Sequence, residues 1–394
     1  MVYCTSVARS WRGSALDMPV TASYDEKPFV YLTAFNQVVV VADRPAERPR
    51  QVCFVMSSPG TTIRISPKSG ITGGEVTIEC DNLDTSEPAK CVVWFGAEQA
   101  HIVALGPHRV VALVPELKQS GSVEVILEST AKRSAPAAFV VGKKIAEDLH
   151  PVTNPAFDPD EGALFVTRSG SRGEQLPVSL FRIELNGEVS EFSGDITNPT
   201  AIAFDKDGQM FVTSRVDGTV YRINPFREAV AFVRNLGIAT GMAFDRAGTM
   251  YVGDRTGTVY KVNGIGEEKA WVQLEPSVSA YHLAFGPENA LYVTGPTVTS
   301  FDSVYRIDQQ GKVRVFYKGL GRPQGLAFDD EGNLYLAASL KGRRGIVRIS
   351  PDGDAELFVA GMNLVGLVFS SSGDMVVASN DSVYCLSLGI KGLL

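Results

Sequence analysis

A repeat of about 40 residues constrains this sequence more than any other feature. It is a short apolar run that ends in a phenylalanine, followed by a polar turn and further strand-like segments. The phenylalanines stand 47, 40, 41, 43 and 41 residues apart, within the usual length of one propeller blade. The repeat therefore predicts an all-β, six-bladed propeller over residues 143–394. The six phenylalanines are Phe157, Phe204, Phe244, Phe285, Phe328 and Phe369.

Each repeat reads as several short strands joined by turns. In one copy NPTAIAF is followed by the turn DKDGQ and the strands MFVT and TVYRI. Outer strands such as EAVAFV follow five of the six copies, so the last copy lacks its own. Residues 143–148 precede the first copy at the place of such a strand. We expect them to form the outer edge of the last blade and to close the ring, which leaves no unpaired edge.

The aligned segments NPTAIAF, SAYHLAF and RPQGLAF, with their DG-type turns, resemble the six-bladed propellers of the NHL-repeat and SMP-30/gluconolactonase-like families. In the lactonase branch this resemblance implies a metal at the channel mouth, held by an acidic residue, an Asn and an Asp. None of the matching residues is a carboxylate or an Asn, and Asn154 stands one residue later. They are Thr153, Thr200, Thr240, Tyr281, Gln324 and Val365.

Hard divalent cations need several anionic or strongly dipolar oxygens at once. The sequence therefore predicts no catalytic residue, no metal ligand and no cofactor. The alternative is a metal-dependent lactone hydrolase with one Ca or Mg ion in the channel, whose ligands lie in another register. The DKDG-type turns also invite a calcium interpretation, but they are short and lack a chelating Glu, and Asp and Gly suit tight turns.

Cationic residues cluster in the loops that follow the second strands. With the predicted register they gather on one face of the ring, where Asp254 is placed to pair with one of them. Planar guanidinium donors suit carboxylate and phosphate groups. We therefore hypothesise an anionic small molecule or acidic peptide bound at the mouth; the alternative is a set of solvated surface arginines. The cations are Arg168, Arg172, Arg215, Arg255, Lys341, Arg343 and Arg344.

The predicted ligand-binding set combines these cations with neutral donors. His282 is the one histidine expected at the mouth, and as a lone imidazole it lacks the orienting carboxylate of a general base. Motifs such as GxSxG and HExxH are absent from the sequence. A binding protein rather than an enzyme is the favoured interpretation. The set is Thr153, Thr200, Arg215, Thr240, Asp254, Arg255, Tyr281, His282 and Gln324.

Residues 61–142 read as a second domain of short strands spaced 10–15 residues apart, which indicates an immunoglobulin-like β-sandwich. The string ISPKSGITGGEVTIEC, followed by VVWFG and a closing AFVV, resembles the IPT/TIG family of immunoglobulin-like domains. Some members of that family bind DNA, but acidic residues outnumber basic ones here, so phosphate binding is not expected. A spacer or protein-contact module is the favoured role.

Residues 1–60 show no clean periodicity. The run from 29 to 42 is β-like without an obvious partner, and RPAERPR resembles a charged linker. We expect a poorly ordered tail, because ordering it would cost backbone entropy with little apolar burial. An alternative start at Met56 is a further hypothesis.

Composition narrows the remaining function classes. A net charge of −7 argues against nucleic acid, and no apolar run approaches the ~20 residues of a membrane span. With no recognisable signal peptide, a cytoplasmic location is the expectation. Cys80 and Cys91 lie close enough in sequence to be bridged, although two buried free thiols are favoured.

Overall fold

The computed structural model describes residues 62–393 except 119, 131, 172, 173 and 300, together with the backbone of four short strands nearer the N-terminus. The chain forms two compact units, Met1–Thr62 and Ile63–Leu394. The expectations of a poorly ordered tail and of a start at Met56 lie outside the described residues.

The first unit contains one antiparallel sheet in the order β1-β2-β3-β4. The β-like run that lacked a partner in the sequence is in fact two strands that pair with each other, with Phe29 opposite Ala42. The strands are β1 (Ala22–Ser23), β2 (Phe29–Ala34), β3 (Gln37–Ala42) and β4 (Cys53–Phe54).

The second unit begins with a β-sandwich. One sheet has the order β10-β11-β7-β5 and the other runs β6-β13-β12-β8-β9. Inward-facing residues such as Val76, Ile78, Phe95 and Phe139 form its core. Cys80 and Cys91 are buried free thiols. The strands are β5 (Ile63–Ser66), β6 (Ser69–Gly70), β7 (Glu75–Cys80), β8 (Val92–Phe95), β9 (Glu98–Ala100), β10 (Ile102–Leu105), β11 (Arg109–Leu113), β12 (Gly121–Glu128) and β13 (Ala137–Val141), with a short 3-10 helix η1 (Pro88–Lys90).

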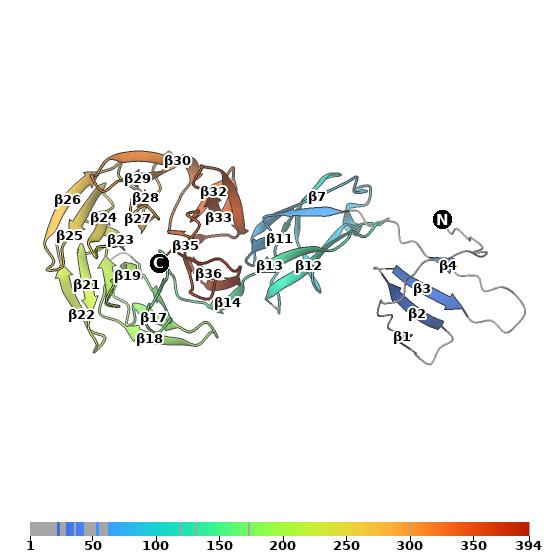
Figure 1. The fold of residues 1–394 in the computed structure, drawn as a ribbon, viewed down its shortest axis with the longest axis horizontal. Helices are drawn as coiled ribbons and strands as arrows, with labels where there is room; N and C mark the ends of the chain where they lie inside the picture. Colours follow the sequence, from blue (N-terminus) through green and yellow to red (C-terminus); the bar gives the residue numbers. More distant parts are fainter. Residues whose placement is uncertain are drawn as a thin grey trace, which may run out of the picture. The chain divides into compact units, whose positions relative to one another are not determined.

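Six antiparallel blades follow around a ring (Figure 1). The predicted fold, an immunoglobulin-like sandwich plus a six-bladed propeller, is confirmed. The first three blades are β15 (Ala156–Phe157), β16 (Leu164–Thr167), β17 (Leu180–Ile183) and β18 (Val189–Ser193); β19 (Pro199–Phe204), β20 (Met210–Ser214), β21 (Thr219–Ile223) and β22 (Ala229–Val233); and β23 (Ala239–Phe244), β24 (Met250–Asp254), β25 (Thr258–Val262) and β26 (Glu268–Gln273).

The last blade takes its outer strand from the beginning of the propeller. Strand β14 (Lys143–Ala146) pairs antiparallel with β37, with Lys143 opposite Cys385, and so joins the two ends of the ring. The remaining strands are β27 (His282–Phe285), β28 (Leu291–Thr294), β29 (Asp302–Ile307) and β30 (Val313–Gly321) in blade 4; β31 (Leu326–Phe328), β32 (Leu334–Leu340), β33 (Arg343–Ile349) and β34 (Ala355–Ala360) in blade 5; and β35 (Leu364–Phe369), β36 (Asp374–Ser379) and β37 (Val383–Ser387) in blade 6.

The repeated phenylalanine holds neighbouring blades together. Phe204 of blade 2 packs on Phe165 of blade 1 with ring centroids 5.9 Å apart, and Phe244 packs on Phe211 of the preceding blade at 5.4 Å. The same contact recurs in later blades, for example between Phe328 and Tyr292 at 4.7 Å. Edge-to-face rings are favoured over a face-to-face sandwich, so one aromatic pair gives a repeatable contact at each of the five junctions from blade 1 to blade 6.

The sandwich and the propeller share a sheet. Strand β6 runs parallel to β13 of the sandwich on one side and to β34 of blade 5 on the other. Ile71, 2% exposed, belongs to the hydrophobic cluster of blades 5 and 6, whereas Ala360 of blade 5 belongs to that of the sandwich. The two domains therefore exchange core residues instead of being joined by a flexible linker.

Candidate functional site

We call the side of the ring that carries the loops after the second strands the loop face, and the opposite side the turn face. The loop face includes residues 168–171, 174–179, 215–218 and 255–257 and the residues that open the inner strands. The turn face carries the tight turns between first and second strands, such as residues 205–208, each closed by a backbone hydrogen bond.

The predicted threonine donors lie at the starts of the inner strands, where they link neighbouring blades. Thr153, Thr200 and Thr240 are all buried, at 5%, 2% and 1% exposure. The Thr200 hydroxyl lies 2.7 Å from that of Thr213 and 3.3 Å from the carbonyl oxygen of Ala239 in the next blade. These hydroxyls therefore satisfy inter-blade hydrogen bonds instead of standing free for a ligand.

Tyr281 and Gln324 also serve the inner strands. The Tyr281 N–H donates to the Thr240 hydroxyl (2.9 Å), and its phenol donates to the Glu275 carbonyl. Burial raises the pKa of the Tyr281 phenol well above its ordinary value. Gln324 is half-buried, and its backbone carbonyl accepts a 2.7 Å hydrogen bond from the Thr294 hydroxyl.

His282 opens the inner strand of blade 4 and is buried, with 4% exposure. Desolvation lowers the pKa of its imidazole from 6.5 to about 4, so the side chain is neutral at pH 7. A neutral imidazole offers one donor and one acceptor to a ligand and no charge.

The buried imidazole predicts a pH dependence of stability. Below pH 6.5 the unfolded chain binds a proton at this position, whereas the native state binds it only near pH 4. The free energy of unfolding should therefore fall by about 2–3 kcal/mol between pH 7 and pH 4.5 through His282 alone. Urea denaturation of wild type and His282→Gln at both pH values measures this difference. Identical pH dependence in the two proteins would contradict it.

Asp254 stabilises its own loop. Its carboxylate accepts hydrogen bonds from the backbone N–H groups of Ile238 (2.8 Å) and Thr256 (3.1 Å), and from the Thr256 hydroxyl. Ion pairs of the described residues do not include Asp254. The pairing with a loop cation that we expected from the sequence is thus replaced by backbone capping.

Arg215 and Arg255 occupy equivalent positions in blades 2 and 3. The backbone N–H of Arg215 donates to the carbonyl of Asn198, and that of Arg255 to the carbonyl of Ile238. The Arg255 side chain also donates from Nε to the Ser277 carbonyl at 3.3 Å. The two guanidinium groups are therefore presented by the same element of adjacent blades.

Other cations of the predicted set are placed differently. Arg343 Nη2 donates to the carbonyl of Ser66 in the sandwich (2.5 Å), so this residue serves the domain junction. Arg168 lies over the Phe181 ring, 6.0 Å from its centroid. Lys341 and Arg344 are exposed, and Arg172 is outside the described residues.

Charge pairing differs between the two faces. On the turn face, third-strand arginines of blades 1, 4 and 5 pair with carboxylates: Arg182 with Glu161 and Glu184, Arg306 with Glu288, and Arg348 with Glu356. Loop-face carboxylates instead accept from their own loops, as Asp302 does from Thr297 and Arg322 N–H groups. Within the described part of the chain, neither Arg168 nor Arg255 forms an ion pair.

The residues at the channel do not fit a divalent cation. The hydroxyls are engaged between blades, and Asn154 accepts from the Leu367 N–H (3.0 Å) and donates to the Leu326 carbonyl (2.8 Å). Among the described residues, no group of three or more His, Cys, Asp or Glu side chains is placed to hold a metal. In the DKDG turn, Asp205 Oδ1 accepts from the N–H groups of Asp207 and Gln209, both at 2.9 Å, as expected for a turn residue.

The sequence analysis missed the role of Asn154 and the burial of Ser169. Asn154 links three blades. The sequence signal for this contact was glycine at the aligned position of blades 5 and 6, Gly325 and Gly366, where the Asn154 segment approaches closely. Ser169, in the loop of blade 1, is 2% exposed and its hydroxyl has no hydrogen-bond partner. Nothing in the sequence distinguishes this serine from its neighbours.

Comparison with known proteins supports the two-domain architecture. Residues 61–141 match the IPT/TIG domain family. A putative gluconolactonase superposes with a TM-score of 0.53 at 16% identity, covering 64% of this chain and 93% of its own. A gluconolactonase from Xanthomonas campestris gives 0.52 at 16% identity, covering 62% and 87%. An auxiliary nutrient binding protein from Bacteroides thetaiotaomicron gives 0.50 at 14% identity, covering 83% and 98%. The curated protein sequences give no match.

These likenesses confirm the expected combination of an IPT/TIG domain with a propeller similar to those of gluconolactonases. The alignment with the nutrient binding protein covers a larger share of the chain than the propeller alone makes up, so it extends into the sandwich. At such identities the likeness establishes the fold. No helix in the described part of the chain is long and apolar enough to cross a membrane.

Proposed function

We propose that this protein is a non-catalytic binding protein whose loop face takes an anionic small molecule or acidic peptide. The supporting observation is a difference in charge pairing: Arg168 and Arg255 have no carboxylate partner among the described residues, whereas Arg182, Arg306 and Arg348 on the turn face are each paired with a carboxylate. Arg215 stands at the position equivalent to Arg255. Guanidinium groups on adjacent blades suit a carboxylate or phosphate, which each can bind with two parallel N–H donors.

The neutral members of the predicted set have a smaller part in this proposal. Because the Thr200 and Thr240 hydroxyls are buried between blades, they shape the inner strands that position the arginines. His282 and Gln324 stay as neutral polar groups of the mouth. The likeness to an auxiliary nutrient binding protein agrees with a small-molecule ligand.

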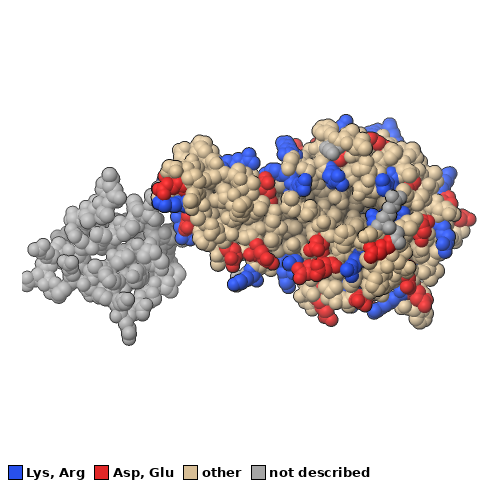
Figure 2. Space-filling view, turned by 180° about the vertical axis from the view of Figure 1, so that it is seen from behind, with Lys and Arg blue, Asp and Glu red and all other residues tan. Residues whose placement is uncertain are grey.

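Charge is mixed on one face of the molecule. On the face in view in Figure 2, basic and acidic side chains are interspersed and form no broad basic patch. A nucleic acid would need such a patch. An anionic ligand of small size needs only two or three converging cations, which agrees better with this distribution.

Substituting Arg215 and Arg255 together by alanine tests the proposal. Calorimetric titration with gluconate, glucuronate and a glutamate-rich peptide should show binding of at least one probe to wild type. We expect the double variant to lose about tenfold or more in affinity, because two charge-assisted contacts are removed. The matched control is R314A/K269A, which removes two exposed cations from outer strands and should bind as wild type does.

Unchanged affinity in R215A/R255A would contradict the loop-face site. The runner-up, a metal-dependent lactone hydrolase, predicts a different result. It requires hydrolysis of sugar lactones that depends on added Ca, Mg or Mn ions and is abolished by a chelator. That outcome would replace the binding proposal by the enzymatic one.

A further inference from the structure

The turn face carries a cavity of about 670 Å³ in the groove between blades 1 and 2. Its walls come from the turn at residues 158–162 and strand β17 in blade 1, and from the turns at residues 205–208 and 224–227 in blade 2. The proposed loop-face site does not use this groove, which is on the other side of the ring.

Aromatic rings line the inner part of the groove. Phe165 lies 4.8 Å from Phe192 and 5.9 Å from Phe204, measured between ring centroids. The guanidinium of Arg227 already lies over the Phe192 ring, 5.0 Å from its centroid. The face of the Phe192 ring therefore accepts a cation within this groove.

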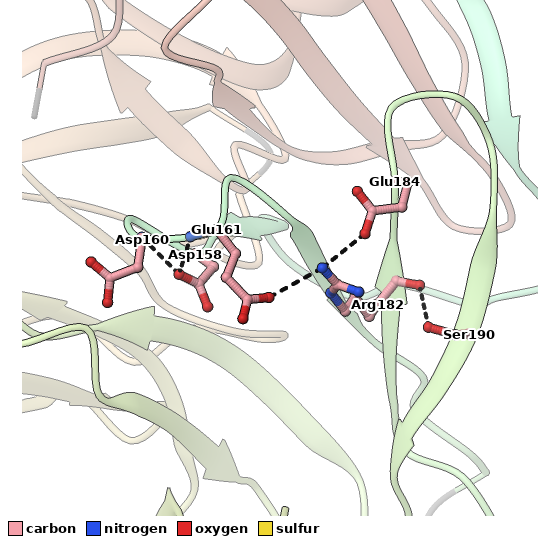
Figure 3. A network of polar contacts seen from close by, with 6 residues as sticks. All are labelled: Asp158, Asp160, Glu161, Arg182, Glu184 and Ser190. Atoms are coloured by element: carbon pink, nitrogen blue, oxygen red, sulfur yellow. Dashed lines mark hydrogen bonds and ion pairs between the residues drawn. The ribbon is translucent and has the colours of Figure 1, made fainter. Parts of the chain in front are cut away.

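Carboxylates stand at the rim of the groove. Arg182 is neutralised by Glu161 and Glu184, as Figure 3 shows, so it adds little net charge. Asp158 and Asp207 line the groove, and the Asp160 carboxylate lies beside Gly208. None of the three has a cationic partner among the described residues, against the single guanidinium of Arg227. Only one oxygen of Asp158 is engaged, by the N–H groups of Asp160 and Glu161. The groove therefore combines net negative charge and free carboxylate oxygens at its rim with an apolar floor of phenyl rings.

The next two grooves show which chemistry fits this place. Between blades 2 and 3 the aliphatic stem of Lys206 covers Gly248, its Cδ 3.7 Å from the position of a Cβ on that glycine. Between blades 3 and 4 Arg246 Nη2 donates to the Pro287 carbonyl at 2.8 Å. In both grooves the chain itself supplies a long cationic side chain from the second residue of the turn.

In the groove between blades 1 and 2 the equivalent residue is Pro159, and the carboxylate of Asp160 lies against Gly208, its Oδ2 2.6 Å from the position of a Cβ on that glycine. We infer that this groove binds an external aliphatic amine, a primary ammonium carried on an alkyl stem, between the carboxylates of its rim and the phenyl rings of its floor. The source is either the lysine side chain of a partner protein or a free polyamine. Both present the same chemistry to the phenyl rings and the carboxylates.

Titration of the full chain by NMR or calorimetry tests the inference, with pentane-1,5-diamine and an acetyl-Gly-Lys-Gly-amide peptide as probes. Pentan-1-ol and the norleucine peptide are the neutral counterparts and should not bind. Preference for the peptide would indicate a partner's lysine, and preference for the diamine a polyamine. No binding of either amine at about 10 mM, a concentration above even weak dissociation constants, would overturn the inference.

Two variants locate the binding. Asp207→Asn removes a rim charge without a structural partner and should weaken amine binding about fivefold or more. Pro159→Lys restores the lysine of the next repeat, fills the groove and should compete with the probe. The control is Asp352→Asn, an exposed carboxylate in a turn of blade 5, which should leave binding unchanged.

Binding that survives both D207N and P159K, or that falls equally in D352N, would contradict a site in this groove. R215A/R255A separates the two proposals, because it removes cations from the loop face and should not affect amine binding. Loss of anion binding with retained amine binding in this variant is the result expected if both sites exist. Unchanged anion affinity would contradict the loop-face site alone, and loss of amine binding would contradict a separate site in the groove.

Discussion

Replacing Gly74 by alanine should split the thermal unfolding of the second unit into two transitions. A Cβ on Gly74 would stand 2.4 Å from the carbonyl oxygen and 2.6 Å from the carbonyl carbon of Ala360. Both are backbone atoms at the end of β34, so no side-chain rotation relieves the overlap. The sandwich must then move away from blade 5.

Separation would break a continuous interface. The Ile71 N–H donates to the Ala360 carbonyl at 2.9 Å, and the Ser69 hydroxyl donates to the Phe358 carbonyl at 2.7 Å. Ile71 would also lose its buried place among residues of blades 5 and 6, worth about 2–3 kcal/mol for a fully buried aliphatic side chain. Domains that share this interface should unfold together, and domains that have lost it should unfold independently.

Differential scanning calorimetry of the full chain measures the effect, with Gly106→Ala as the control. Gly106 lies in the same sandwich, but an added Cβ there meets only the Arg109 carbonyl, at the ordinary contact distance of 3.4 Å. We expect wild type and G106A to share one transition for the second unit. A single unshifted transition in G74A would contradict the prediction, because the two domains would then still unfold together despite the added Cβ.

Asn154→Asp should destabilise the propeller by about 2–3 kcal/mol. The amide of Asn154, from blade 1, accepts from the Leu367 N–H of blade 6 and donates to the Leu326 carbonyl of blade 5. An aspartate keeps the acceptor but turns a second oxygen toward the Leu326 carbonyl. It therefore exchanges a hydrogen bond for a repulsive contact at the place where the ends of the ring meet.

The control uses an asparagine whose donor is not needed. Asn186, in an exposed turn, accepts from the Glu188 N–H at 2.9 Å, and aspartates fill the same role at Asp205 and Asp245. Asn186→Asp should therefore leave the midpoint of urea denaturation unchanged, while N154D lowers it. Equal midpoints for wild type and N154D would rule out this amide as a closure of the ring.

Gly325 and Gly366, the glycines beside Asn154, leave the space that this residue occupies between the blades. A Cβ on Gly366 would lie 2.5 Å from the Asn154 backbone N and Cα. The sequence showed Gly325 and Gly366 inside inner strands, where glycine is otherwise unfavourable, and this pattern marks a close approach of another segment. It did not show which segment approaches, because the partner lies more than 150 residues away in the chain.

Local patterns predicted the architecture because each repeat contains the apolar run, the turn and the strands of one blade. From the second copy on, the repeated phenylalanine packs on an aromatic of the preceding blade, as Phe204 does on Phe165, so the recurrence specifies a series of packed blades. The outer strand missing from the last copy was also visible in the sequence, and β14 occupies that place. The β-rich run near the N-terminus was less informative, because a hairpin between its own two halves has no periodic signature.

The candidate site was predicted only in part, because residue type does not reveal a hydrogen-bond partner. Thr200 and Asp254 looked like ligand groups at the mouth, yet the first bonds to the next blade and the second caps its own loop. Arg343 was grouped with the loop cations, but the shared sheet turns it toward Ser66. The sequence by itself determined the repeat, the fold class and the supply of cations and hydroxyls, since these depend on local periodicity and composition. Only the tertiary structure decided which polar groups stay free, because each is satisfied or left over by a partner from another blade or domain.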